Sequence, residues 1–170
     1  MGCAACRRPG SPWKTCRSAR NIPAVSQMTV HVRSAHEGSF SVGWSGPHSL
    51  VVDRGPGDGG QGMGFNGGQL LLLALGACFT NDVFREAAKR DLDVRGVRVV
   101  VDCDWEGDPP RATNVRYSTR VEAEAGEDEI MELIRHVDEI AEVHGTLRDG
   151  ISIELTEAEA VSMQVETSTL

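Results

Sequence analysis

The sequence predicts an α+β domain in which two helices pack against antiparallel strands. Three observations predict it. Segments that alternate apolar and polar residues lie between turn residues in the first third of the chain, which indicates short antiparallel strands. A long apolar helix follows, and after it come two more alternating segments and an amphipathic helix. We therefore expect the element order βββ-α-ββ-α-β, with the last strand at Ile151–Leu155.

The three opening strands are expected to form an antiparallel meander, because turn residues at Glu37-Gly38 and Ser45-Gly46-Pro47 separate them. Their expected ranges are Thr29–His36, Ser39–Ser45 and His48–Asp53. The glycine-rich segment Gly55–Gly64 comes next. It lacks the Lys-Ser/Thr pair of a phosphate-binding loop, and so it indicates a flexible loop.

The long helix should begin after Asn66, a good N-cap residue, and run to about Lys89 or Arg90. Its first half, Leu70–Phe79, is apolar on nearly every side, so we expect it to be buried all round. From Asn81 the helix becomes amphipathic. The residues expected to face inward there are Val83, Phe84 and Ala87 or Ala88.

The second half of the domain should hold two long strands and one further helix. The first strand places alternate residues on one face, from Val97 to Trp105, with Cys103 among them as a core residue. The second strand is expected at Asn114–Glu124 and the amphipathic helix at Glu127–Val143.

Length and composition allow one ordinary globular domain. The chain has 170 residues, of which 40% are hydrophobic and 25% are charged. Its net charge of −8 argues against nucleic acid as the main partner, because phosphate binding needs a basic face. We expect no membrane span, since the longest apolar run is far shorter than the ~20 residues that a span needs. The five cysteines have no paired spacing, which favours a reducing, cytoplasmic location.

Residues 1–27 are expected to form a disordered basic extension, before a folded domain at 28–156 and a polar tail at 157–170. Residues 1–36 carry six Lys and Arg residues and no acidic residue, and prolines punctuate the extension. A transit-like segment and a true start at Met28 are the alternatives that the composition leaves open. The cysteines of the extension lack the paired ligands of a zinc site, so we expect no metal: Cys3, Cys6 and Cys16.

Two motifs resemble those of the OsmC/Ohr family of osmotically inducible and organic-hydroperoxide-resistance proteins. Asn66–Phe79, NGGQLLLLALGACF, resembles the family helix Asn-Pro-Glu-x-Leu…Ala-x-Cys-Phe without a gap. Ile140–Arg148, IAEVHGTLR, resembles the second motif, Cys-Pro-x-Ser-Asn-x-x-Arg. The resemblance covers about residues 28–155, and the order of elements agrees as well. It implies an OsmC/Ohr-like fold in an intertwined homodimer with two sites at the subunit interface.

The resemblance also implies a chemistry. Active members of the family reduce organic hydroperoxides with two cysteines in each site. The first thiolate attacks the peroxide and becomes a sulfenic acid, and the second cysteine converts it to a disulfide that a dithiol reduces. An arginine holds the first cysteine as thiolate, and a glutamate on the same helix orients that arginine.

This sequence matches the family motifs only in part. Cys78 stands at the position of the first, peroxidatic cysteine. The glutamate position holds Gly68, and the second cysteine position holds Ala141. The motif serine is replaced by His144, which is an accessory candidate as a proton carrier or a loop histidine without chemistry. The chain therefore keeps one catalytic cysteine.

The activating arginine would come from the opening strands, where Arg54 is the first candidate and Arg33 the second. Cys78 lies about three turns into its helix, beyond the reach of the helix dipole. Burial and Asp82 should both raise the pKa of its thiol. Arg85 leans back toward Cys78 and is an accessory candidate, unless it simply pairs with Asp82.

Two function classes follow. In one, the protein detoxifies small organic hydroperoxides with Cys78, and an external thiol resolves the oxidised cysteine. In the other, Cys78 is an inert core thiol and the dimer binds a small hydrophobic molecule without catalysis. Neither class needs a cofactor or metal. The reactivity of Cys78 toward a peroxide distinguishes the two.

Overall fold

The computed structural model describes residues 27–35, 38–150, 153 and 155–157, and the chain divides into two compact units. The first unit ends at Gly64 and the second begins at Phe65. The predicted extension, tail and last strand (Ile151–Leu155) fall almost wholly outside the described residues, so these three expectations stay predictions.

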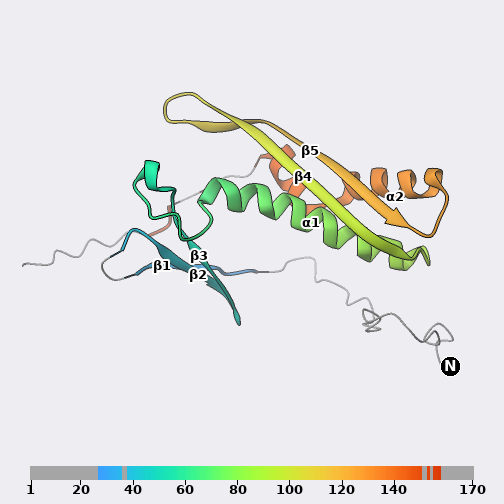
Figure 1. Ribbon diagram of the computed structural model, residues 1–170, viewed down its shortest axis with the longest axis horizontal. Coiled ribbons are helices and arrows are strands. Elements are labelled where there is room, and N and C mark those ends of the chain that lie inside the picture. The colour runs from blue at the N-terminus through green and yellow to red at the C-terminus, as the bar shows by residue number, and fades with distance from the viewer. Residues whose placement is uncertain (1–26, 36–37, 151–152, 154, 158–170) are drawn as a thin grey trace, which may run out of the picture. The chain divides into compact units, whose positions relative to one another are not determined.

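The first unit contains the predicted antiparallel meander (Figure 1). Its strands are β1 (His31–Ser34), β2 (Ser41–Ser45) and β3 (His48–Val52), each paired with the next. The turn between β2 and β3 requires glycine at its first position, where Gly46 has a φ of +54°. The meander is confirmed, with strands slightly shorter than the sequence predicts.

The predicted loop at Gly55–Gly64 is present, and it is tied to Asp53 by hydrogen bonds that the sequence does not predict. The segment contains a short 3-10 helix, η1 (Pro56–Asp58), and it folds around the buried carboxylate of Asp53. That carboxylate accepts hydrogen bonds of 2.8–3.1 Å from three backbone N–H groups: Arg54, Gln61 and Met63. The bond from Met63, with the other two, lowers the pKa of Asp53 against the opposing effect of burial. The ionised carboxylate of Asp53 therefore fixes the backbone conformation of this segment.

Gly60 closes this loop because no side chain fits at its position. A Cβ atom there would overlap the backbone carbonyl group of Arg54, whereas a Cβ atom at Gly57 would meet nothing within 4 Å. We expect Gly60→Ala to lower the free energy of unfolding by about 1–3 kcal/mol, the usual cost of overpacking. Gly57→Ala, the matched control, should stay within about 0.5 kcal/mol of the wild type in urea unfolding. Equal stability of the two variants would contradict the closed loop.

The second unit begins with the long helix α1 (Gly67–Lys89), which confirms the predicted bounds. Asn66 caps it as predicted, since its side chain accepts from the Gln69 N–H while the Gln69 side chain accepts from the Asn66 N–H, both at 2.9 Å. Among the described residues, α1 alone is long and apolar enough to span a membrane by length and composition. Two charged residues of α1, Asp82 and Glu86, are buried, and the helix packs against a β-strand of the second unit, as a core helix does.

A long hairpin and two shorter helices complete the second unit (Figure 1). The hairpin consists of β4 (Val94–Glu106) and β5 (Arg111–Ala123). Helices α1 and α2 (Glu127–Ile140) lie side by side on one face of it. The core between them contains residues from both helices: Phe79, Val83, Ala87, Leu133 and Val137. The observed α+β fold thus agrees with the sequence prediction.

Two local expectations are wrong. The predicted single helix Glu127–Val143 is broken at Ala141, whose extended backbone (φ −63°, ψ 117°) ends α2 and starts α3 (Glu142–Asp149). Phe84, which was expected to face inward, is 46% exposed. Phe84 follows Phe79 by five positions, about 140° around a helix, so both cannot face the same core.

Candidate functional site

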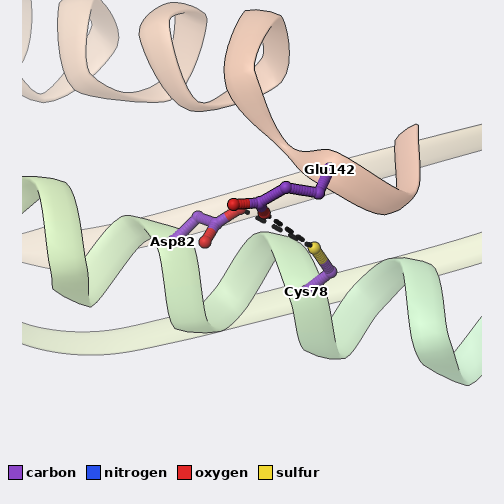
Figure 2. Close-up of side chains that lie close together, drawn as sticks. All are labelled: Cys78, Asp82 and Glu142. Atoms are coloured by element: carbon purple, nitrogen blue, oxygen red, sulfur yellow. Dashed lines mark hydrogen bonds between the residues drawn. The ribbon is translucent and has the colours of Figure 1, made fainter. Parts of the chain in front are cut away.

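The Cys78 thiol lies between two carboxylates (Figure 2). Its Sγ atom is 3.7 Å from Asp82 Oδ2 and 3.7 Å from Glu142 Oε2. Asp82 lies one turn further along α1, whereas Glu142 is the first residue of α3. The break at Ala141 is what brings Glu142 to α1, because α3 leaves the direction of α2 there.

Arg85 binds the same two carboxylates. Its Nη1 atom lies 2.8 Å from Asp82 Oδ1 and 3.2 Å from Glu142 Oε1. Its Nε atom lies 3.0 Å from Glu86 Oε1, so the guanidinium contacts three acidic side chains. The alternative in which Arg85 pairs with Asp82 is therefore confirmed. Arg85 offsets the negative charge around the thiol.

The two carboxylates differ in their affinity for a proton. Burial raises the pKa of Asp82, and the charge of Glu142 adds to this effect against that of Arg85. The pKa of Glu142 is lowered, first by a hydrogen bond from its own backbone N–H at the start of α3. As the pH falls, Asp82 therefore takes up a proton before Glu142 does.

The environment raises the pKa of the Cys78 thiol. Burial is the largest cause, and the negative charges of Asp82 and Glu142 add to it. A hydrogen bond from the Val143 N–H, at the start of α3, acts in the opposite direction. The expectation that burial and Asp82 raise this pKa is confirmed. Within the second unit, Cys78 is a protonated thiol at neutral pH.

The donor atoms of Cys78, Asp82 and Glu142 lie within 4.8 Å of one another, close enough to hold a cation. The Arg85 guanidinium already binds both carboxylates and supplies the positive charge that a metal ion would bring. We therefore assign no metal to this cluster. The cysteines of the N-terminal extension lie outside the described residues.

His144 lies in α3 and not in a loop, which corrects one of its two predicted roles. Its ring is buried, with its centroid 4.9 Å from that of Tyr117 and 5.9 Å from that of Phe79. Neither ring nitrogen has a hydrogen-bond partner among the residues that the structure describes. Burial and then the charge of Arg148 lower the pKa of His144, so the imidazole is neutral at pH 7.

Arg148, at the motif arginine position, belongs to a separate hydrogen-bond network. Its Nη2 atom donates to Asp138 Oδ1 at 2.6 Å, and the Tyr117 hydroxyl donates to the same oxygen. Burial and this bond to Asp138 raise the pKa of Tyr117. The network joins α2, α3 and β5, and so it fixes the orientation of the helix that carries Glu142.

Gly68 and Ala141 stand at the motif positions of the glutamate and the second cysteine, and the structure shows what surrounds each of them. A Cβ atom at Gly68 would lie 2.7 Å from the Trp105 ring, so the indole takes the space that a larger side chain would need. Ala141, at the position of the second cysteine, is buried. Neither position offers a functional group to Cys78.

Both arginine candidates lie in the first unit. Arg33 lies in β1 opposite Val42, and Arg54 follows β3, where the Asp53 loop holds its backbone. Because Cys78 belongs to the second unit, the pairing of either arginine with its thiol stays a prediction.

Glu142 is the site residue that sequence reasoning missed. Apolar residues continue at helical spacing through Ala141, so the sequence predicts one helix. The structure has a break there, which turns Glu142 toward α1. One signal was available. Glu142 stands at the position of the motif proline directly after Ala141, and proline is favoured in the first turn of a helix.

A hollow of about 510 Å³ lies elsewhere in the second unit, between α1 and β4. Apolar side chains dominate its lining, which includes Phe65, Leu72, Leu73, Val99 and Val101. It could hold a small apolar molecule.

The comparisons with known proteins agree with the fold. The family model described as OsmC-like protein matches residues 58–156. An OsmC-like protein from Mycoplasma pneumoniae has a similar structure, with a TM-score of 0.61 and 18% identity over 72% of this chain and 88% of that chain. The organic hydroperoxide resistance protein OsmC of Legionella pneumophila, described as a predicted redox protein, aligns with a TM-score of 0.55 and 16% identity over 74% and 91% of the two chains.

A third solved structure is the organic hydroperoxide resistance protein OhrB of Bacillus subtilis, with a TM-score of 0.51 and 17% identity over 72% of this chain and 91% of that chain. Among curated proteins, none matches the chain. The family match covers more than half of the sequence and contains Cys78 and both motifs. The chain belongs to the OsmC-like family.

Proposed function

We propose that this protein reduces small organic hydroperoxides, with Cys78 as the reacting thiol and an external thiol as the reductant. The observation that carries the proposal is the half-buried, free thiol of Cys78 at the first-cysteine position of the family motif. The names of the Legionella and Bacillus relatives, which are organic hydroperoxide resistance proteins, support the same chemistry.

The proposed reaction has two stages. The Cys78 sulfur attacks the terminal oxygen of the hydroperoxide, an S–O bond forms, and the O–O bond breaks. Sulfur is oxidised to a sulfenic acid, the peroxide is reduced to an alcohol, and the thiol proton ends on that alcohol. One external thiol then releases water from the sulfenic acid to form a mixed disulfide, and a second external thiol restores Cys78. Ala141 cannot resolve the sulfenic acid, so we assign this step to an external thiol.

Burial, and then the carboxylates of Asp82 and Glu142, raise the pKa of Cys78, so a guanidinium close to the sulfur would assist the reaction by offsetting this effect. Arg54 is our first candidate and Arg33 the second, while Arg85 and His144 are accessory candidates. We further propose that the folded domain at 28–156 works as a homodimer in the cytoplasm, with residues 1–27 as an extension outside the site.

The proposal predicts a specific oxidation product. After one equivalent of cumene hydroperoxide, mass spectrometry should find a sulfenic acid on Cys78, or a mixed disulfide once a small thiol is added, and no disulfide within the chain. Cys78→Ser should abolish peroxide consumption. An unmodified Cys78 would contradict the function, whereas a bond between Cys78 and Cys103 would show that Cys103 resolves the sulfenic acid.

A second candidate function is the binding of a small apolar molecule without catalysis. The hollow between α1 and β4 and the protonated state of Cys78 favour it. In this case Cys78 would stay reduced in the same experiment, and an apolar fluorescent dye would bind to the protein with saturation.

A further inference from the structure

Glu142 offers the Cys78 thiol a proton acceptor that the family motif does not contain. The Oε2 atom of Glu142 lies 3.7 Å from the sulfur, and the carboxylate is ionised, as the start of α3 and the Arg85 guanidinium favour its charged form. Its side chain is 60% exposed, so it also meets solvent and any ligand that reaches the sulfur. Asp82, by contrast, is buried.

We propose that Glu142 is a catalytic residue that takes the proton of Cys78 as the sulfur attacks the peroxide and delivers it to the departing alkoxide. The inference rests on the proposed function, since it concerns the same thiol and the same hydroperoxide. The S–O bond forms and the O–O bond breaks as described above. The proton leaves sulfur for Glu142 Oε2, passes to the alkoxide oxygen, and leaves Glu142 ionised again.

The charges around the sulfur favour this route. Asp82 and Glu142 face the thiol, and each repels a thiolate, while Arg85 binds the two carboxylates. A preformed thiolate is therefore disfavoured in this cluster. Transfer of the proton during the attack avoids that state, because no full negative charge develops on sulfur before the S–O bond forms.

A purely electrostatic role of Glu142 and a proton-carrying role predict different rates of Cys78 oxidation in the neutral variant Glu142→Gln. Glu142→Gln removes one negative charge and so lowers the pKa of Cys78. If charge alone matters, both alkylation and oxidation of Cys78 become faster. If Glu142 carries the proton, alkylation by iodoacetamide still becomes faster, because it proceeds through the thiolate, which the lower pKa favours and whose proton goes to solvent, and because iodide leaves without a proton. Oxidation by a hydroperoxide becomes slower.

The test measures both rate constants at pH 7 on the full chain, with the Cys78 peptide quantified by mass spectrometry. For Glu142→Gln we expect the ratio of cumene hydroperoxide oxidation to iodoacetamide alkylation to fall by at least about tenfold, the lower end of general acid–base effects. Glu139→Gln is the matched control, since it removes the same charge from an exposed position on α2 and should leave the ratio unchanged.

A second variant tests whether the effect of Glu142→Gln comes from a changed structure at the start of α3. Glu142→Ala should show the same fall in the ratio, and added formate should restore oxidation without affecting alkylation. A ratio equal to that of the wild type, or oxidation that rises together with alkylation, would overturn the role of Glu142. If wild-type Cys78 is alkylated but never oxidised, the proposed function itself fails.

Discussion

Replacement of Phe79 by alanine is expected to lower the free energy of unfolding by about 3–5 kcal/mol, the usual cost of removing a buried aromatic ring. The Phe79 side chain is fully buried at the centre of the core, where α1 meets α2 and the hairpin. Its ring also lies 5.2 Å from that of Tyr117 and 5.9 Å from that of His144. Urea unfolding at a fixed protein concentration measures the effect.

Met131→Ala is the control for this prediction. Met131 is also a large apolar residue on a helix of the second unit, but 43% of it is exposed. We expect a loss of less than about 1 kcal/mol, because little apolar surface returns to water. A similar loss of stability in the two variants would mean that the core does not centre on Phe79.

The features that the sequence predicted well are set by short-range patterns. The start of α1 depends on Asn66 and Gln69, three residues apart, and both are visible in the sequence as a helix cap. The strands of the meander depend on alternation and on turn residues such as Gly46. These signals need no knowledge of the tertiary structure.

The features that the sequence did not predict depend on contacts between distant residues. The buried carboxylate of Asp53 organises a loop whose glycines, taken alone, indicate flexibility. The apolar periodicity continues across Ala141, so the sequence does not indicate that the helix breaks there. The break is seen only in the structure, where α3 packs on α1. Glu142 was missed for that reason, since its contact with Cys78 joins residues 64 positions apart.

The charge of the Cys78 site was predicted in part. Asp82 and Arg85 follow Cys78 on the same helix, so their effects could be expected from spacing. The contribution of Glu142 could not, because it comes from another helix. The activating arginine is harder still, since Arg33 and Arg54 belong to a different unit from the cysteine.

One face of α1 is not covered by the rest of the second unit. Leu73 is 50% exposed and Phe84 is 46% exposed, with Ala77 between them on the same face of the helix. The expectation that the apolar first half of α1 is buried on all sides is therefore not met within the second unit. The first unit also exposes apolar side chains on its small sheet, such as Val32 and Leu50. Exposed apolar surface of this extent favours association with a second copy.

We therefore expect an obligate homodimer that buries well over ~2,000 Å² in total, with α1 of each chain in the interface. Leu73→Glu should produce a monomer, because a carboxylate in the middle of an apolar interface loses its hydration without gaining a partner. Met131→Glu, at a similarly exposed apolar position on α2, is the matched control and should stay dimeric. Sedimentation at micromolar concentration distinguishes these states. A monomeric wild type would contradict the dimer, and a dimeric Leu73→Glu protein would place the interface away from this face of α1.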